Sequence, residues 1–185
     1  MSDAGGKKEA GQILRVADLH VAISRGGGWT EAVRGVSIAV DAGEALGIVG
    51  ESGSGKTLMV SAIARLLPVG VRVTGGSIRW RGEDLMRASP RRLAGIRGRE
   101  ISMVFQDSQT SLNPIMRIGD QVREPLLLHR LVGRSKADWE ALDWLRRLGI
   151  PDPAAAMRRY PHEFSGGMRQ RAMIATALIA SPGLV

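Results

Sequence analysis

A glycine-rich octapeptide carries the clearest chemical signal in this sequence. Residues 50–57 read GESGSGKT, with three glycines, two serines, a lysine and a threonine in one short segment. Glycine permits positive φ angles and lets backbone N–H groups approach an anion closely. The Lys56 ammonium suits the β- and γ-phosphates of a nucleotide, and the Thr57 hydroxyl suits Mg²⁺. The segment therefore predicts a loop that binds a phosphate chain.

Every position of this loop is a candidate contact for the nucleotide. The loop alone does not distinguish ATP from GTP, and it also occurs in kinases of small molecules. The guanine-selecting pattern N-K-x-D is absent, because the only asparagine is Asn113. This argues against a GTPase. The candidate nucleotide-binding residues are Gly50, Glu51, Ser52, Gly53, Ser54, Gly55, Lys56 and Thr57.

The motif needs a strand before it and a helix after it. Residues 44–49, EALGIV, predict a short buried strand, and apolar residues at helical spacing predict a helix over 56–67. Strand patterns precede residue 106 and helical patterns follow it, which predicts an α/β core with a helical insertion. Further strands are expected at 13–23, 32–40, 75–82 (as an edge strand or hairpin) and 101–105, and helices at 89–97, 117–131, 136–148, 153–159 and 165–180.

Composition narrows the class of protein. The net charge is +8, but the basic residues are scattered and aromatic residues make up only 4% of the chain, so we expect no nucleic-acid partner. There are no cysteines, which excludes thiolate catalysis within these residues. No apolar run is long enough to span a membrane, and residues 1–12 are expected to be a disordered tail. Trp139 and Trp144 are expected in the core of the helical insertion, and His129 and His162 in structural roles.

A second helix start has the composition of an anion site. Ser165 is a good N-cap residue, and Gly166 and Gly167 leave the next backbone N–H groups accessible. An isolated Ser-Gly-Gly is most often an ordinary capped helix. Here it follows a phosphate loop in the same chain, which favours a second phosphate-binding site.

The segment around it resembles a known family. PHEFSGGMRQR, residues 161–171, is similar to the signature motif of ATP-binding cassette (ABC) proteins, usually LSGGQ, with Phe164 in place of Leu and Met168 in place of Gln. The resemblance implies that Ser165, Gly166 and Gly167 close over the ATP held by a second nucleotide-binding subunit, identical or paralogous. It implies ATP and Mg²⁺ as cofactors.

Two further segments resemble the same family. MVFQDSQTSLNP, residues 103–114, is similar to the Q-loop, which implies that Gln106 contacts Mg²⁺ and the attacking water and that the following loop touches membrane subunits. TSLNP, IGDQVREPLLLH and GIVGESGSGKT resemble the ATPases of oligopeptide, dipeptide and nickel importers. The family also stacks adenine on an aromatic residue upstream of the phosphate loop, a position that Trp29 approximates.

The resemblance implies a fold and a domain plan. The expected fold is an ABC-type P-loop core with an N-terminal antiparallel β subdomain and an inserted helical subdomain. Residues 13–106 form the core, 107–164 the helical subdomain and 165–185 the signature helix, so 13–185 make a partial nucleotide-binding domain. The implied function is ATP-driven uptake of peptides or a related small solute. Its partners are membrane subunits, and indirectly a solute-binding protein, at the cytoplasmic side of the inner membrane.

The family's catalytic strand is not found. No run of four apolar residues followed by Asp-Glu occurs, and Leu184-Val185 lie where the family begins that strand. We therefore expect the C-terminal part of the core to be missing, ATP hydrolysis by this chain alone to be weak or absent, and solubility to be poor. Two alternatives stay open. One is a catalytically dead ATP-binding module, and the other is a soluble phosphotransferase, which leaves Ser165-Gly166-Gly167 unexplained.

Overall fold

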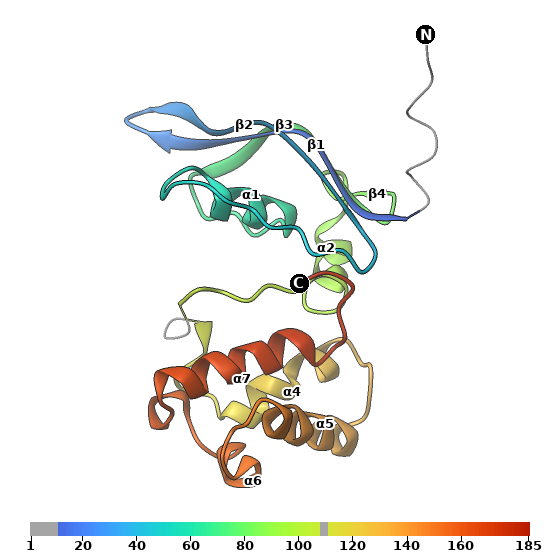
Figure 1. Ribbon diagram of the computed structural model, residues 1–185, viewed down its shortest axis with the longest axis vertical. Helices are drawn as coiled ribbons and strands as arrows, with labels where there is room; N and C mark the ends of the chain where they lie inside the picture. Colours follow the sequence, from blue (N-terminus) through green and yellow to red (C-terminus); the bar gives the residue numbers. More distant parts are fainter. Residues whose placement is uncertain (1–10, 108–110) are drawn as a thin grey trace. The chain divides into compact units, whose positions relative to one another are not determined.

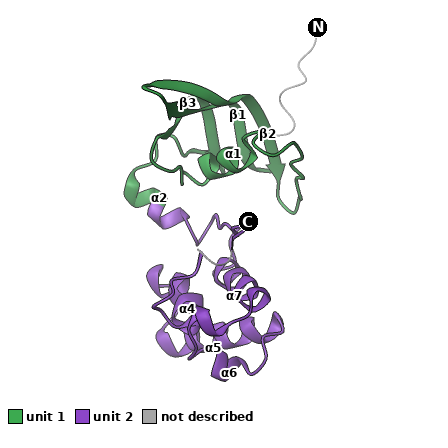
Figure 2. Cartoon of the chain, turned by 90° about the vertical axis from the view of Figure 1, so that its left-hand side faces the viewer, with its two compact units in different colours: residues 1–93 green, residues 94–185 purple. Residues whose placement is uncertain are grey.

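The computed structural model describes residues 11–107 and 111–185, and it divides into two compact units, residues 1–93 and 94–185 (Figures 1 and 2). The predicted tail lies almost wholly outside the described residues. The division falls before the predicted core boundary at residue 106, so residues 94–106 group with the helical part.

An antiparallel sheet forms the framework of unit 1. Its strands are β1 (Gln12–Arg25), β2 (Gly28–Asp41), β3 (Val71–Trp80) and β4 (Glu83–Asp84), in the order β2-β1-β3-β4. β1 and β2 are joined at Gly26 and Gly27, whose φ angles of 55° and 82° suit a tight hairpin turn. The strands at 13–23 and 32–40 are thus confirmed and extended, and 75–82 is a hairpin of β3 and β4.

One face of this sheet is covered by the helix that follows the phosphate loop. More buried and more exposed residues alternate along much of β1 and β3. α1 (Lys56–Ile63) contacts β1, β2 and β3 (Figure 1). α1 is shorter than the predicted helix 56–67 because Arg65 adopts a left-handed φ of 57°. The buried apolar residues on the strands and α1 include Leu14, Val16, Leu19, Val21, Met59, Ala62, Ile78 and Trp80.

Two predicted buried strands are not formed. Residues 44–49 have no strand structure, and Val49 is 97% exposed. Of the predicted strand 101–105, only Ile101 is bridged, in parallel to Arg97 and Leu184, and Phe105 is 47% exposed. Both predictions of a strand are wrong for this structure. An apolar segment becomes a parallel strand only when neighbouring strands bond to it, and no ladder among the described residues includes either segment.

Unit 2 is a small helical bundle. Its helices are α4 (Ile118–Leu128), α5 (Arg134–Arg147), α6 (Pro153–Ala156), a 3₁₀ turn η1 (Pro161–Glu163) and α7 (Gly166–Leu178), while α2 (Pro90–Ile96) crosses the boundary between the units. These confirm the predicted helices to within a few residues at each end. The core is made by Ile118, Val122, Leu126, Ala137, Ala141, Leu145, Ala172 and Ala175.

The two tryptophans of α5 differ in environment. Trp144 packs against the core, as expected. Trp139 is 59% exposed, so its predicted core position is wrong. The core side of α5 is made by Ala137, Ala141 and Leu145, which follow each other at helical spacing. Trp139 falls outside that stripe.

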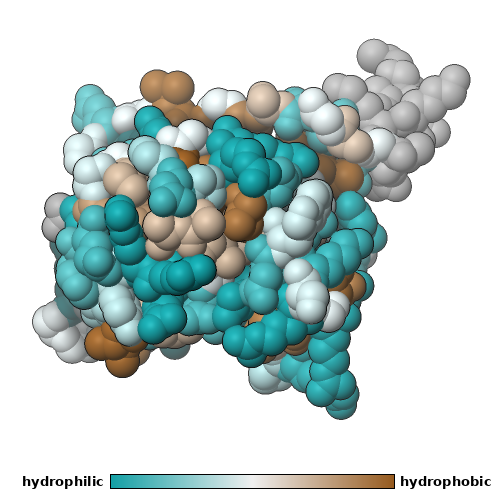
Figure 3. Space-filling model, turned by 90° about the horizontal axis from the view of Figure 1, so that it is seen from below, coloured by the Kyte–Doolittle hydropathy of each residue, from teal (hydrophilic) through white to brown (hydrophobic). Residues whose placement is uncertain are grey.

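The surface is mixed in character. The face shown in Figure 3 is largely hydrophilic, and its hydrophobic residues form small separate patches. Within residues 11–107 and 111–185, no helix has the length and apolar content needed to cross a membrane.

Candidate functional site

The phosphate loop encloses its own lysine. The Lys56 ammonium donates hydrogen bonds to the main-chain oxygens of Gly50 (2.6 Å) and Glu51 (2.7 Å) and lies 3.2 Å from Ser54 Oγ. An ammonium has three donors, and all three are directed at loop oxygens. The charge therefore lies inside the loop before any anion arrives, and a phosphate oxygen can replace these acceptors.

Gly55 fixes how the loop joins α1. It is the N-cap of the helix with φ 90°, and it provides no side-chain cap. A Cβ on Gly55 would lie 2.8 Å from the main-chain oxygen of Ala32, so only glycine permits this close approach to β2. The first amides of α1 have no intrahelical acceptor, and the positive end of the helix dipole favours an anion there.

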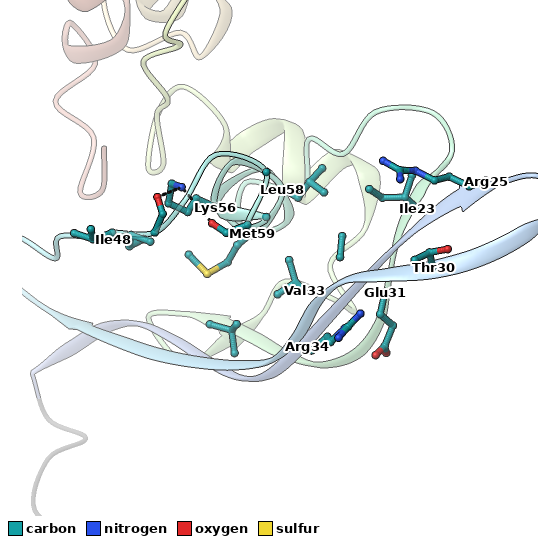
Figure 4. A pocket seen from close by; sticks show the side chains of 17 residues that line it. Ile23, Arg25, Thr30, Glu31, Val33, Arg34, Ile48, Lys56, Leu58 and Met59 are labelled. Carbon is teal, nitrogen blue, oxygen red and sulfur yellow. Dashed lines mark hydrogen bonds between the residues drawn. The ribbon is translucent and has the colours of Figure 1, made fainter.

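A pocket of about 700 Å³ lies beside this loop (Figure 4). The loop and α1 form one wall, with Lys56 and Met59, and β1 and β2 form the other, with Ile23 and Val33. In Figure 4, Met59 extends from α1 and Val33 extends from β2 into the gap between the two walls. The pocket thus has an apolar interior next to the anion-binding loop, which suits a ligand with both a phosphate chain and a flat apolar base.

The charged residues of the pocket are mostly basic. Arg25, Arg34 and Lys56 line it together with one acid, Glu31. Oε1 of Glu31 lies 3.1 Å from Nδ1 of His20, so this carboxylate already has a partner. The balance of charge favours a polyanionic ligand. The motif could not reveal Arg25 and Arg34 as lining residues, because they lie on β1 and β2, outside residues 50–57.

Trp29, the predicted adenine contact, lies at the β1–β2 turn, paired with Ser24. Its side chain is 47% exposed, and the guanidinium carbon of Arg72 lies 3.9 Å from the ring centre. Trp29 does not line the pocket, but its neighbour Thr30 does. One face of the ring is thus occupied by a cation, and stacking of a base would use the other.

The second predicted anion site is a well-formed helix start in unit 2. Ser165 Oγ accepts a hydrogen bond from the amide of Met168 (3.3 Å), which confirms Ser165 as the N-cap of α7. Gly166 and Gly167 are exposed, and a Cβ on either would meet nothing within 4 Å. Glycine is therefore not required there by packing within this chain, which leaves room for another molecule to approach closely.

Arg169 supports this helix start, a role that the sequence did not reveal. Its Nη1 donates to the main-chain oxygens of Phe164 (2.9 Å) and, more weakly, Pro161 (3.4 Å). Glu163 also accepts a hydrogen bond from the amide of Tyr160 (2.7 Å), which closes the preceding turn. The segment that leads into Ser165 is therefore held from both sides.

The predicted magnesium contacts fall in different units. Thr57 is exposed at the start of α1 in unit 1, and Gln106 is exposed in unit 2. No cluster of three or more acidic or histidine side chains suitable for a metal occurs among the described residues. A hydroxyl and an amide oxygen alone suit a cation that is held mainly by nucleotide phosphates and water, as Mg²⁺ usually is.

Solved structures share this fold. A dimeric ATP-binding cassette in a post-hydrolysis state, bound to ADP and Pi, superposes with a TM-score of 0.80 at 25% identity, covering 91% of this chain and 70% of that one. A second dimeric bacterial ABC transporter cassette gives the same TM-score at 26% identity. These likenesses confirm the predicted cassette fold, with its antiparallel β part and helical region.

Curated relatives come from peptide transport systems. The dipeptide transport ATP-binding protein DppD of Bacillus subtilis is 47% identical over 175 residues, which are 94% of this chain and 52% of the relative. The oligopeptide transport ATP-binding protein OppD of Escherichia coli is 43% identical over 179 residues, 97% of this chain and 53% of the relative. The resemblance to the peptide branch is thereby confirmed. The chain spans about half the length of these relatives.

The family model supports the same assignment. The model described as ABC transporter matches residues 33–185, which include the phosphate loop, Gln106 and Ser165-Gly166-Gly167. Sequence motifs, cassette fold and family match agree, and the chain therefore belongs to the ABC transporter family.

Proposed function

We propose that this chain is the ATP-binding part of an importer that takes up peptides or a related small solute. The observation that carries the proposal is the loop at residues 50–57, with the Lys56 ammonium enclosed by loop oxygens beside a pocket of about 700 Å³. The similarity to dipeptide and oligopeptide transport proteins supports the choice of cargo.

We expect the phosphate loop, the start of α1 and the basic residues of the pocket to contact the nucleotide. The phosphate chain replaces the loop oxygens around Lys56 and accepts hydrogen bonds from the first amides of α1. Arg25 and Arg34, which line the same pocket, add positive charge to it and favour an anionic ligand. Thr57 supplies a hydroxyl to the Mg²⁺ that accompanies the nucleotide, and Gln106 is the proposed contact to Mg²⁺ and the attacking water.

Ser165, Gly166 and Gly167 are proposed to act on another nucleotide. They form the exposed start of α7, where a Cβ added to either glycine would have no neighbour within 4 Å. Such an open surface suits an interface with a second nucleotide-binding subunit. The dimeric state of the solved cassettes supports this arrangement. Membrane subunits at the cytoplasmic side of the membrane complete the proposed assembly.

Nucleotide binding is tested directly on the purified chain. A fluorescent ATP analogue is titrated with Mg²⁺ against the unmodified chain and against Lys56→Ala. Loss of one charge-assisted contact to phosphate costs about 1.5–3 kcal/mol, so affinity should fall about 10- to 100-fold. Arg91→Ala serves as the control, because Arg91 is exposed on α2 and lines none of the pockets described here. Equal affinity for Lys56→Ala and the unmodified chain would contradict the proposal.

The role of Trp29 in adenine binding needs a separate comparison. We propose that the ring face opposite Arg72 stacks on the base. Trp29→Ala should then weaken ATP binding about fivefold to tenfold, because stacking on an aromatic ring contributes about 1–1.5 kcal/mol. Binding of pyrophosphate, which has no base, should not change. If ATP and pyrophosphate both bind to Trp29→Ala as they bind to the unmodified chain, the base does not stack on Trp29.

A further inference from the structure

A second hollow lies within unit 2, among the helices of the bundle. It has a volume of about 580 Å³, a size that suits a small molecule. Arg123 lines it from α4, Arg134 and Trp139 line it from α5, and Arg117 and Arg158 line it from the segments next to α4 and α6. None of its lining residues lines the pocket beside the phosphate loop, so the two sites are separate.

The acids of this hollow balance only one of its four arginines. The Arg123 guanidinium forms ion pairs with both aspartates of the hollow, Asp120 and Asp138, and its side chain is only 13% exposed. The other three arginines are exposed, and among the described residues their side chains have neither a hydrogen bond nor an ion pair. They are Arg117, Arg134 and Arg158. The hollow therefore keeps a positive charge that none of its own acids balances.

Two of these arginines also oppose the dipole of a helix. Arg117 is the N-cap residue of α4, and Arg134 is the first residue of α5, whose first turn contains no acid. A positive side chain is unfavourable at the positive end of a helix dipole. Residues that contradict a local preference in this way are expected chiefly at functional sites. An anion bound in the hollow would offset the cost.

Trp139 supplies an open aromatic ring to the same hollow. Each of the other three tryptophans has an arginine over its ring: the guanidinium carbon lies 3.9 Å from the ring centre of Trp29, 5.0 Å from that of Trp80 and 5.7 Å from that of Trp144. Among the described residues, no cation and no second ring contacts Trp139, which is 59% exposed. Its ring is therefore available to stack on a flat group of a ligand.

The ring and the cations together indicate one class of ligand. Each guanidinium presents a planar fork that binds two oxygens of a phosphate or a carboxylate. We infer that the hollow binds a small organic anion that carries a flat ring and a phosphate or carboxylate group. The ring stacks on Trp139, and the anionic group lies among the guanidinium groups of Arg117, Arg134 and Arg158. This site is independent of the nucleotide site proposed above.

The inference is tested on the full chain with Lys56→Ala present, so that the phosphate loop contributes little. The probe is naphthyl phosphate, which has a flat ring and a phosphate group, and its affinity is measured by calorimetry. Arg134→Gln/Arg158→Gln should weaken binding at least about tenfold, because two charge-assisted contacts are lost. Arg91→Gln/Arg130→Gln lowers the net charge equally at exposed positions outside the hollow and should leave affinity within about twofold.

The aromatic contact is tested in the same background. Trp139→Ala should weaken the binding of naphthyl phosphate about fivefold to tenfold, whereas Trp139→Phe keeps a ring and should retain most of the affinity. Glycerol phosphate has no ring, so its binding should not change in Trp139→Ala. The indole Nε1–H signal of Trp139, identified by its loss in Trp139→Phe, should shift in NMR spectra when naphthyl phosphate is added.

The inference is overturned if naphthyl phosphate does not bind, if the Arg134/Arg158 and Arg91/Arg130 variants behave alike, or if Trp139→Ala has no effect. Binding of an acidic peptide through the same residues, without binding of naphthyl phosphate, would also overturn it and would identify a docking surface for a polypeptide. Because Lys56→Ala is present throughout, failure here leaves the proposed nucleotide site unaffected, and that site has its own test.

Discussion

The side chain of Gln121 on α4 holds the backbone of Asn113 through two hydrogen bonds. Gln121 is only 6% exposed, accepts a hydrogen bond from the Asn113 amide (2.8 Å) and donates one to the Asn113 main-chain oxygen (2.9 Å). The same amide group also donates to the main-chain oxygen of Met116 (2.9 Å). One buried glutamine thus satisfies three backbone groups of a four-residue turn, which fixes the position of the turn on α4.

Replacing Gln121 with Leu should loosen this turn. Three backbone groups lose the hydrogen bond to the glutamine, although the Asn113 main-chain oxygen still accepts one from the Met116 amide (3.2 Å). Since Asn113 is exposed, water replaces part of the loss. We expect a loss of about 1–3 kcal/mol in the free energy of unfolding. Amide exchange at Asn113 should also become faster, as measured by hydrogen exchange. Gln170→Leu, at an exposed position of α7, is the matched control. An equal effect of the two substitutions would show that the hydrogen bonds of Gln121 contribute nothing specific.

The close approach of Gly55 to Ala32 makes a second prediction. Gly55→Ala combines a φ of 90° with a contact of 2.8 Å to the Ala32 main-chain oxygen, so the loop must shift. We expect nucleotide affinity and thermal stability to fall together. Gly53 has a similar φ of 82°, but a Cβ added there would meet nothing within 4 Å. Gly53→Ala therefore measures the effect of the strained φ angle alone. If the two variants bind a fluorescent ATP analogue equally well, the approach to β2 does not shape the site.

His20 should make unfolding depend on pH. The hydrogen bond to Asp18, with a smaller one to Glu31, raises the pKa of His20 above its usual 6.5, against a lesser desolvation. A raised pKa means that the folded state binds the proton more tightly. The contribution to stability is therefore fully present below pH 6.5 and is lost as the pH rises through the folded-state pKa. The effect is modest, because the surrounding side chains are partly exposed.

Urea unfolding of the unmodified chain and of His20→Gln, from pH 5.5 to pH 8.5, checks this prediction. The gap between the two stabilities should narrow as the pH rises. Asp18→Asn removes the principal partner and should flatten the pH dependence as well. A constant gap over the whole range would mean that His20 titrates alike in the folded and unfolded chain.

Ser165 should stabilise α7 as its N-cap. Ser165→Ala removes the acceptor of the Met168 amide, and such caps contribute about 1 kcal/mol. At 3.3 Å the bond is long, so the loss should fall in the lower part of the usual range. Ser165→Asp keeps an acceptor and should retain most of the stability in thermal unfolding. An unchanged melting temperature for Ser165→Ala would show that this cap does not stabilise α7.

Most helices and the antiparallel strands could be predicted because their signals are local. Apolar spacing placed α4, α5 and α7, and the strand patterns at 13–23 and 32–40 placed β1 and β2. Local apolar spacing could not decide whether residues 44–49 and 101–105 form strands. Their apolar runs indicate burial, but a parallel strand exists only through bonds to segments distant in sequence. Trp139 was misplaced because an aromatic residue on a helix is as compatible with the surface as with the core.

The sequence by itself determined the chemistry of the two glycine-containing helix starts. Lys56 and Ser165 act through backbone groups a few residues away, so spacing alone specifies them. Only the tertiary structure decided what surrounds them. Strand pairing brought Arg25 and Arg34 into the pocket that the phosphate loop also lines. Pairing between strands depends on which residues meet across the sheet, and composition and local periodicity do not encode that choice.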